Sequence, residues 1–446
     1  MRPTTVADYN SNDRALEMAI DIYFNGIGSP PLRCTRENHI IDCSLLDEAC
    51  VDSSTPLGAP SSNELSFTLL SENGLFNPAN TASTFYGKIK TGVPVRAYIR
   101  PIVNMNVQEE YVWDSLGLFF VTDWQTDITG VTASVTANDS IYQLINKTAS
   151  KLPVYSNCTY ARLLQEFLNY NDASASIIGS LGIEMAYAYV DDTNDKFLNE
   201  FSLGALAFIY CNHAGIIEVS ALERQQEVQY VLTDSDQIIS IKADQSILLE
   251  YDGVSLTYSA PRLSDEQELI VNNDQVVQAY GRVSYKSNSF SKVPVYGLNR
   301  TVIESKLDCV VASIEANSID IDYDIDNLTG SSGTFSTRIY GYVIESNDYT
   351  LEDTGDNLLK VSNKYIQTEE YAQHVKALLN RYTAAKVPKL ELEVRGNPKY
   401  TIGSKVRVHS TAYNVDFTGI LIRQQFVYDG GLRATMTILN SEIIGA

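Results

Sequence analysis

Residues Lys90–Ile99 have the sequence KTGVPVRAYI, and residues Tyr400–His409, near the other end of the chain, have the sequence YTIGSKVRVH. When Gly92 is aligned with Gly403, a Val-Arg pair falls at the same place in both segments. In each segment a glycine precedes alternating apolar and polar residues, a pattern typical of a strand entered from a turn. The two segments therefore predict an internal repeat of β-structure.

A second pair of segments extends this repeat. Residues Gly117–Asp127, with the sequence GLFFVTDWQTD, alternate again, and aligning Gly117 with Gly419 places Trp124 on Phe426. Each copy then has a glycine-marked turn, a strand with Val-Arg, a loop, a long strand and a hairpin in the same order. This order predicts two related antiparallel β-domains in one chain, separated by insertions.

The composition is that of a globular chain with several domains. It has 446 residues, of which 44% are hydrophobic and 20% charged, and its 28 tyrosines favour strands. No run approaches the roughly 18 apolar residues of a membrane-spanning helix. The first residues lack the apolar segment of a secretory signal peptide. We therefore expect synthesis in a cytoplasm.

The formal net charge of −22 limits the possible partners. Unaided binding of nucleic acid needs Lys and Arg to displace counterions from phosphate, and this balance disfavours it. An acidic surface is compatible with the opposite role, a wall past which DNA slides without sticking. A soluble acidic protein without any such role has the same charge.

Two regions carry helical patterns. Residues 150–222 resemble a small α/β unit, in which TYARLLQEFLNY forms a helix capped by Thr159 and SLGALAFIYC a second helix capped by Ser202. Near the C-terminus, the predicted helix 368–386 has an apolar stripe and two glutamates in its first turn, where the helix dipole favours anions.

The usual signatures of catalysis and metal binding are missing. The four histidines, His39, His213, His374 and His409, have no metal-ligand spacing, and the six cysteines form no CxxC pair. The nucleophile elbow, the phosphate-binding P-loop and the Rossmann fingerprint do not occur. We therefore predict no catalytic residue, no cofactor and no metal, and free, mostly buried thiols.

The most suggestive chemical feature is IDIDYDID, residues 319–326. Because a strand has a period of two, Asp320, Asp322, Asp324 and Asp326 lie on one face. This face is the solvated side of a half-buried strand, a calcium site or the carboxylate pair of a glycosidase. The solvated face is the favoured interpretation, because catalytic carboxylates more often converge from different strands.

The order of these features resembles one family, the minor tail proteins that form the tail tip or baseplate hub of tailed bacteriophages. The resemblance is carried by these segments: ENGLFNP (72–78), FYGKIKTGVPVRAYI (85–99), GLFFVTDWQTDITGVTASVTANDSIYQLI (117–145), SLGALAFIYCNHAGIIEVSAL (202–222), QTEEYAQHVKALLNRY (367–382), VRGNPKYTIGSKVRV (394–408) and FVYDGGLRATMTI (426–438). It covers most of the chain, and residues 223–335 match only loosely. These motifs are structural, so the resemblance supplies no catalytic residues.

The resemblance implies a mainly β fold with α+β insertions and two tail-tube-like antiparallel barrel or sandwich domains. The implied division is an N-terminal tube-like domain (1–149), an α/β insertion (150–222), a β-rich insertion (223–334) and a C-terminal tube-like domain (335–446) that holds the helix. Three such chains would present six tube-like domains, so that a homotrimer adapts a hexameric tail tube to a threefold tip.

The implied role is that of a structural hub in the virion tail, assembled in the cytoplasm of the host bacterium. Its partners would be the tail tube and distal tail proteins, tip spike or fibre proteins, and DNA that passes through the exit channel without specific binding. Two alternatives remain open. One is a tail-associated peptidoglycan hydrolase, for which Asp320–Asp326 would be the site, and the other is a carbohydrate-binding adhesin, for which abundant tyrosine is weak support.

Overall fold

The computed structural model describes residues 2–11, 15–50, 55, 57, 59–102, 111–127, 130–222, 227–234, 238–244, 251–385 and 387–444. The fold is mainly β with a few helices, as predicted. Half of the described strands belong to one 13-stranded sheet, and the others form four smaller sheets. Among the described residues, no helix is both long and apolar enough to cross a membrane.

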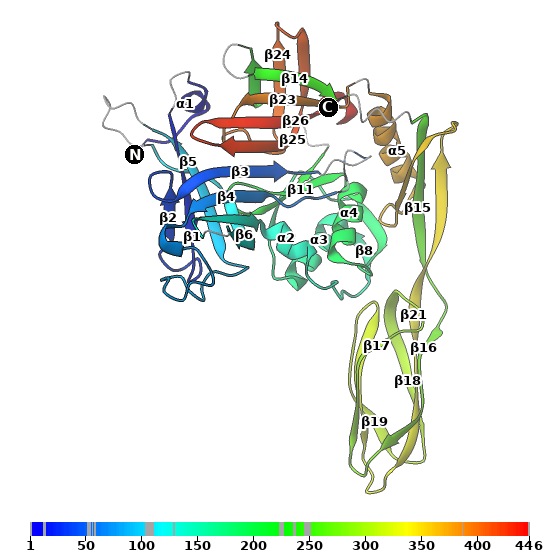
Figure 1. Cartoon of the computed structure of the whole chain (residues 1–446). Coiled ribbons are helices and arrows are strands. Elements are labelled where there is room, and N and C mark those ends of the chain that lie inside the picture. Colours follow the sequence, from blue (N-terminus) through cyan, green and yellow to red (C-terminus); the bar gives the residue numbers. More distant parts are fainter. Residues whose placement is uncertain are drawn as a thin grey trace.

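The centre of the molecule is a run of eight strands that follow one another in the large sheet, and we call this run the strand stack. Figure 1 shows these strands lying one above another, from β14 at the top to β6 at the bottom. In spatial order they are β14 (Ile238–Asp244), β23 (Lys389–Arg395), β26 (Leu432–Asn440), β25 (Val415–Tyr428), β3 (Ile40–Glu48), β4 (Glu64–Leu70), β7 (Thr132–Asn138) and β6 (Asp114–Thr126).

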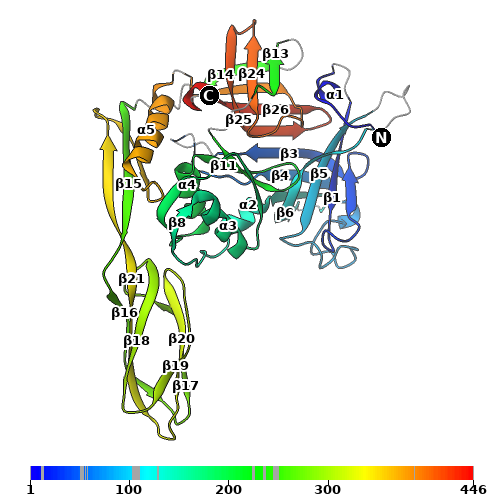
Figure 2. The ribbon, with the colours of Figure 1, turned by 180° about the vertical axis from the view of Figure 1, so that it is seen from behind.

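The remaining strands of the large sheet run across the stack at its two ends. The first half of β6 pairs with β5 (Pro94–Pro101), which continues to β1 (Leu16–Ile22) and β2 (Leu32–Thr35). The first half of β25 pairs with β24 (Lys405–Ser410), which continues to β13 (Tyr230–Thr233). The view from behind shows the same arrangement (Figure 2). Both long strands therefore bend from one set of partners to another.

The stack contains the same four-strand unit twice. The first unit is β3, β4, β7 and β6, and the second is β14, β23, β26 and β25. Val95 lies opposite Phe119 of β6 in the first unit, and Val406 lies opposite Gly419 of β25 in the second. A bulge then follows at the same place, between Val121 and Asp123 in β6 and between Leu421 and Arg423 in β25. The internal repeat predicted from the sequence is therefore present in the strand registers.

The glycine alignment of the repeat is confirmed. Gly92 donates its backbone N–H to the carbonyl of Val121 at 2.7 Å, and Gly403 donates to that of Leu421 at 2.8 Å. The two glycines have φ angles of 80° and 81°, in the left-handed region that favours glycine.

The alignment of the second segment pair was wrong by two residues. The registers match Phe119, not Gly117, with Gly419, and Trp124 with Gln424, not with Phe426. A shift of two residues leaves the alternation of a strand unchanged, so the pattern could not distinguish the two alignments.

Strict alternation along residues 117–127 predicts one apolar face made of Leu118, Phe120 and Trp124, and this prediction was wrong. Phe119 and Val121 are the buried residues, whereas Leu118, Phe120 and Trp124 are only half-buried. The bulge returns Trp124 to the core side, where it lies opposite the buried Val135.

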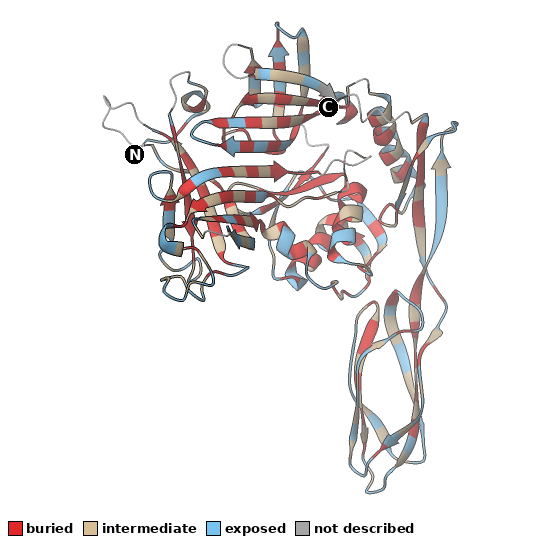
Figure 3. Ribbon diagram, in the orientation of Figure 1, coloured by how far each residue is buried: buried red, intermediate tan, exposed pale blue. Residues whose placement is uncertain are grey.

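One face of the stack is the main hydrophobic core. Side chains from alternate positions of its strands pack there with helix α5 (Glu369–Ala384), for example Leu65, Val135, Leu392 and Ile438, each at most 1% exposed. Figure 3 shows this alternation of buried and exposed residues along the strands. The helix predicted at 368–386 is present as Glu369–Ala384 and is capped by Thr368 through the N–H of Tyr371, and it ends before Ala385, whose backbone is extended. Residue 386 lies outside the described residues.

A second core belongs to a small α/β region. Its elements are α2 (Ser140–Ile145), β8 (Tyr155–Thr159), α3 (Tyr160–Tyr170), β9 (Ala175–Ile178), β10 (Glu184–Ala188), α4 (Asn194–Gly204), β11 (Ala207–Cys211) and β12 (Ile217–Ala221). The helix capped by Thr159 is confirmed.

The second predicted helix of this region was wrong. Helix α4 starts after the N-cap Thr193 and ends at Gly204, and AFIYC is a strand paired with β12. A short apolar run fits a buried strand as well as a helix, and here the partner strand decides.

A long arm extends away from the body (Figure 1). Its central strand is β21 (Gly333–Glu352), which pairs with β15 (Gly253–Leu263) near the body and with β16 (Gln267–Val277) and β18 (Val295–Ser305) further out. A second sheet, of β17 (Arg282–Ser289), β20 (Asp320–Asn327) and β19 (Cys309–Ala316), faces these strands across a separate core. The polar run Val271–Asp274 by itself predicts a turn, and this prediction was wrong, because the segment lies inside β16 around a bulge.

The remaining elements are short: α1 (Val6–Asn10), η1 (Glu72–Gly74), β22 (Leu358–Asn363) and α6 (Ser441–Ile444). Of the residues assigned to a β-rich insertion (223–334), β13 and β14 belong to the large sheet. The assigned limit between residues 334 and 335 falls inside β21. Five of the six cysteines are buried and Cys309 is half-buried, all as thiols, as predicted.

Candidate functional site

The two four-strand units are joined by one strand pairing, which we call the seam. Strand β3 of the first unit pairs antiparallel with the second half of β25, from Glu48 opposite Arg423 to Cys43 opposite Tyr428. The seam makes one continuous sheet of the two units, although its strands come from opposite ends of the chain.

A buried polar cluster lies at the seam. Gln424 and Asp47, which lie opposite each other, are 0% and 1% exposed. The Gln424 amide donates to the Asp47 carboxylate at 3.1 Å and to the carbonyl of Tyr400 at 2.9 Å. His213, from the loop after β11, is 2.8 Å from the same Asp47 oxygen. Because a buried polar group is costly without partners, this cluster makes the seam specific for these two strands.

The pKa of His213 reflects this position. Burial alone would lower the pKa of the imidazole, but the charge of Asp47 and its hydrogen bond outweigh burial and raise it. The protonated histidine therefore stabilises the buried carboxylate and ties the α/β region to the seam.

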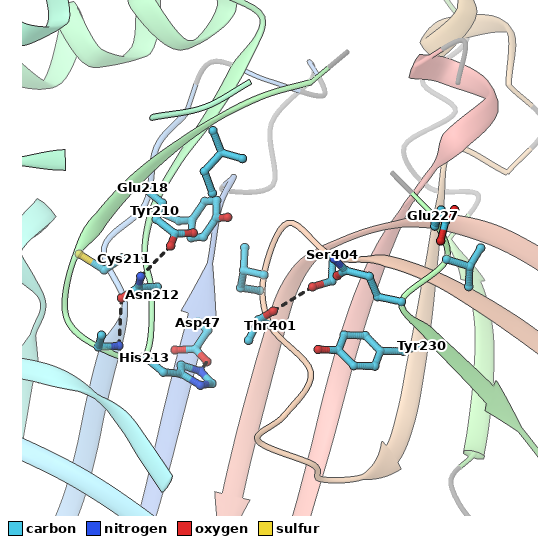
Figure 4. A pocket seen from close by; sticks show the side chains of 15 residues that line it. Asp47, Tyr210, Cys211, Asn212, His213, Glu218, Glu227, Tyr230, Thr401 and Ser404 are labelled. Atoms are coloured by element: carbon cyan, nitrogen blue, oxygen red, sulfur yellow. Dashed lines mark hydrogen bonds and ion pairs between the residues drawn. The ribbon is translucent and has the colours of Figure 1, made fainter. Parts of the chain in front are cut away.

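A cavity of about 1120 Å³ opens beside this cluster (Figure 4). Its walls come from the α/β region, the seam and the segments around Tyr230 and Thr401. The polar groups that Figure 4 connects bond to each other: Asn212 donates to Glu218 at 2.7 Å, and Thr401 and Ser404 are 2.8 Å apart. These bonds organise the junction and do not assemble a nucleophile with a base.

The face of the stack opposite the core is polar, and we call it the open face. Registered positions place hydroxyl and amide side chains across it, with Ser66 beside Thr136 and Gln425 beside Thr435. Its uncharged polar residues are Ser44, Ser66, Thr68, Gln125, Ser134, Thr136, Ser240, Gln425, Thr435 and Thr437.

Charges on the open face are mixed. Its carboxylates are Asp42, Glu48, Glu64, Asp123, Glu391 and Glu393, and its basic groups are Lys242, Arg395, Arg423 and Arg433. Arg423 is 3.3 Å from Glu48 across the seam. The acidic excess of the whole chain is therefore not concentrated on this face.

The aspartates of residues 319–326 lie on β20, in the arm. Their apolar neighbours Ile321, Tyr323 and Ile325 are fully buried, as the solvated-face interpretation expects. The carboxylates are engaged: Asp326 accepts two hydrogen bonds from Arg282, at 2.6 and 2.8 Å, and Asp320 pairs with Lys151.

Hydrogen bonds hold the pKa values of three of these carboxyls below the ordinary range, from the Ser287 N–H to Asp322, from Ser284 and Ser313 to Asp324 and from Arg282 to Asp326. A glycosidase acid needs the opposite shift.

Each of the four histidines has a different partner. His39 packs edge-on against Phe76, with ring centroids 5.1 Å apart, and His374 lies against Tyr371. His409 is 3.7 Å from Asp416, and His213 belongs to the seam. Within the described ranges, no group of three or more His, Cys, Asp or Glu side chains is placed to hold a metal ion.

The seam cluster was not predicted from the sequence, although a signal was present. In β3 the alternate positions Cys43, Leu45 and Asp47 are buried on the core side, so a carboxylate stands where the alternation requires an apolar residue. Such a residue marks a buried polar contact, but its partner Gln424 is too distant in the sequence to be identified from the pattern.

Among the solved structures that match nearly the whole chain are two tail proteins. The 43 kDa tail protein of prophage MuSo2 from Shewanella oneidensis has a TM-score of 0.52 and 11% identity, over 96% of this chain and 99% of that one. A tail protein from Neisseria meningitidis MC58 also has a TM-score of 0.52, with 8% identity, over 96% of this chain and 98% of that one. No protein-family model matches the chain, and no curated protein matches its sequence.

At such low identity these matches establish the fold. The chain has the fold of these two tail proteins over nearly its whole length. The resemblance predicted from the sequence is confirmed at this level.

Proposed function

We propose that the chain is a structural component of a bacteriophage tail tip or baseplate, a hub that adapts a hexameric tail tube to a threefold tip. The observation that carries this proposal is the four-strand unit that occurs twice with the same registers and the same bulge. Two equivalent units per chain give six in a ring of three chains. The fold shared with a prophage tail protein and with a second tail protein supports the same role.

In this proposal the open face of the stack lines the DNA exit channel. Hydroxyl and amide groups interact weakly with phosphate, and the basic groups of this face are outnumbered by carboxylates. Such a wall offers no array of cations that could release counterions and hold the DNA. In this proposal the near balance of charges keeps the affinity of the wall for DNA low, and most of the net negative charge of the chain lies away from the open face.

In this proposal each part of the chain with its own hydrophobic core has its own role. The four-strand units and their crossing strands are the tube-like parts, within residues 1–149 and 335–446 and with β13 and β14 added to the second. The α/β region (150–222) supports the seam through His213. The arm, built mostly from residues 253–352, reaches away from the stack and is the proposed attachment for spike or fibre proteins.

We assign no enzymatic activity to the chain. The aspartates of the arm are bonded to arginine, lysine and serine, and their lowered pKa values suit permanent carboxylates better than a proton donor. The proposed setting is the virion tail, after assembly in the host cytoplasm, with tail tube and distal tail proteins as neighbours.

The deciding experiment is the mass of the purified chain by light scattering, followed by averaged electron images. Three chains around a central channel with a pseudo-sixfold outline are the expected result. A ring of six chains would overturn the proposal, because each chain would then supply only one tube-equivalent unit.

A further inference from the structure

The outer end of the arm, which we call the arm tip, is built from two loops. Residues 278–281 connect β16 to β17, and residues 328–332 connect β20 to β21. Val277 lies opposite Gly333 at this end, whereas the last part of β21 pairs with β15 near the body. The arm tip therefore lies away from the strand stack (Figure 1). Loops held on a scaffold of strands commonly carry binding residues.

Hydrogen bonds hold the two loops in one arrangement. Asn327, at the end of β20, is 2% exposed and donates to the carbonyls of Gln278 at 2.9 Å and Ser331 at 2.8 Å. Its side-chain oxygen accepts from the N–H of Thr329 at 3.0 Å and from the hydroxyl of the same residue at 2.7 Å. The N–H of Tyr280 donates across to the carbonyl of Thr329 at 2.9 Å. A surface fixed in this way loses little conformational entropy when it binds a ligand.

Tyr280 is held out from this surface. Its side chain is 77% exposed, the highest value among the large apolar side chains of the described residues. The hydroxyl end of its ring lies against Gly330, where a Cβ atom would be 3.3 Å from the oxygen. The φ angle of Tyr280 is 51°, in the left-handed region, which is costly for a bulky side chain. The fold gains little packing from this tyrosine, so a strained and exposed ring at this position indicates a binding role.

The arm tip is polar without an unpaired charge in its two loops. Arg282 and Asp326, at the bases of the loops, bond to each other at 2.6 and 2.8 Å. Among the described residues, the NH₂ group of Gln278 and the hydroxyl of Ser331 have no hydrogen-bond partner. The neighbouring turn 306–308 adds one lysine and one aspartate. The two loops consist entirely of uncharged residues: Gln278, Ala279, Tyr280, Gly281, Leu328, Thr329, Gly330, Ser331 and Ser332.

We propose that the arm tip binds a neutral saccharide. A sugar ring presents C–H groups on its faces and hydroxyls around its rim. One face therefore packs on the ring of Tyr280, while the hydroxyls bond to Gln278 and Ser331. Tyrosine together with serine, glycine and asparagine is typical of binding loops, because the rigid aromatic ring supplies contact area and the small polar groups supply adaptable hydrogen bonds.

The size of the arm tip favours this ligand over a protein. One side of a stable protein interface takes about 20–30 residues, more than the two loops together contain. A single sugar unit is comparable in size to one exposed aromatic ring with its polar neighbours. The inference goes beyond the proposed hub role, and it leaves the flanks of the arm to the proposed spike or fibre proteins.

Binding is tested with the full-length chain on an array of neutral oligosaccharides of glucose, galactose, mannose and N-acetylglucosamine. The saccharide that binds best is then titrated into the wild type and the variants by isothermal calorimetry. We expect Tyr280→Ala to weaken binding about tenfold and Tyr280→Phe to retain it, since stacking needs the ring and not the hydroxyl. The matched control is Tyr86→Ala, at a tyrosine that is 52% exposed in the loop before β5, which should bind like the wild type.

A second variant separates binding from folding. Glycine favours the φ angle found at position 280, so Tyr280→Gly should unfold at the urea midpoint of the wild type or above it, while it binds the saccharide about tenfold more weakly. A lower midpoint would show that Tyr280 serves the fold and would count against the proposed site.

Three results of the binding experiments would overturn the site. They are binding of no neutral saccharide at millimolar concentration, binding only of saccharides that carry carboxylate or sulfate groups, and binding that Tyr280→Ala and Tyr86→Ala leave equally strong. None of these results changes the number of chains in a ring, so the hub proposal is decided separately by its mass measurement.

Discussion

Replacing Gln424 by methionine should weaken the seam between the two four-strand units. The change removes a bond to the buried Asp47 carboxylate and a bond to the Tyr400 carbonyl. Together these are worth about 3 kcal/mol, since a hydrogen bond to a charged group contributes more than a neutral one. Methionine has a similar volume, and within the described residues the Gln424 side-chain oxygen has no partner, so its removal returns about 1 kcal/mol. We expect a net loss of about 2 kcal/mol.

Equilibrium unfolding in urea, followed by tryptophan fluorescence and by far-UV circular dichroism, measures this loss. Both tryptophans, Trp113 and Trp124, lie in the N-terminal half, so the two signals separate if the units uncouple. The control is Gln425→Met, on the exposed open face one residue away, which should change the free energy of unfolding by less than about 0.5 kcal/mol. Equal midpoints for both variants would refute the assignment of Gln424 as a seam residue.

Three further predictions concern other contacts. Because the pKa of His213 is raised in the folded state, the stabilisation by its charge is complete below about pH 6.5 and is lost as pH rises through the folded pKa. The urea midpoint of the wild type should therefore fall towards pH 9 more steeply than that of His213→Gln. Parallel curves for the two proteins would contradict this. Thr368→Ala removes the N-cap of α5 and should cost about 1 kcal/mol in the same assay, whereas Thr368→Ser should cost little. Arg282→Ala should raise the pKa of Asp326 towards its ordinary value in an NMR titration, and an unchanged pKa would show that another group lowers it.

The elements with a strong local pattern were predictable from the sequence. Helix α5 has an N-cap, acidic first-turn residues and a regular apolar stripe, all within one segment. The strands of the repeat alternate clearly, and Gly92 and Gly403 mark their turns by a backbone geometry that favours glycine. Each of these signals depends on residues that are neighbours in the chain.

The errors occurred where the partner strand decides. The run AFIYC is a strand because it pairs with β12 in a hairpin, whereas a short apolar run taken alone fits a helix equally well. The offset of Gly117 against Gly419 preserved the period of two, so only the partner strands fix the register. The seam depends on Asp47 and Gln424, which neither composition nor spacing brings together.

The seam also sets the order in which the chain can be completed during synthesis. Asp47 and Gln424 are 377 residues apart, so a ribosome adding 5–20 residues per second needs about 20 to 75 s to reach the second after the first. Once residue 138 has been made, the first unit has all its own strands, but the edge of β3 has no partner until β25 follows. Premature pairing of this edge with another nascent chain is the characteristic misfolding hazard of the architecture, and the buried Asp47 makes a mismatched partner costly.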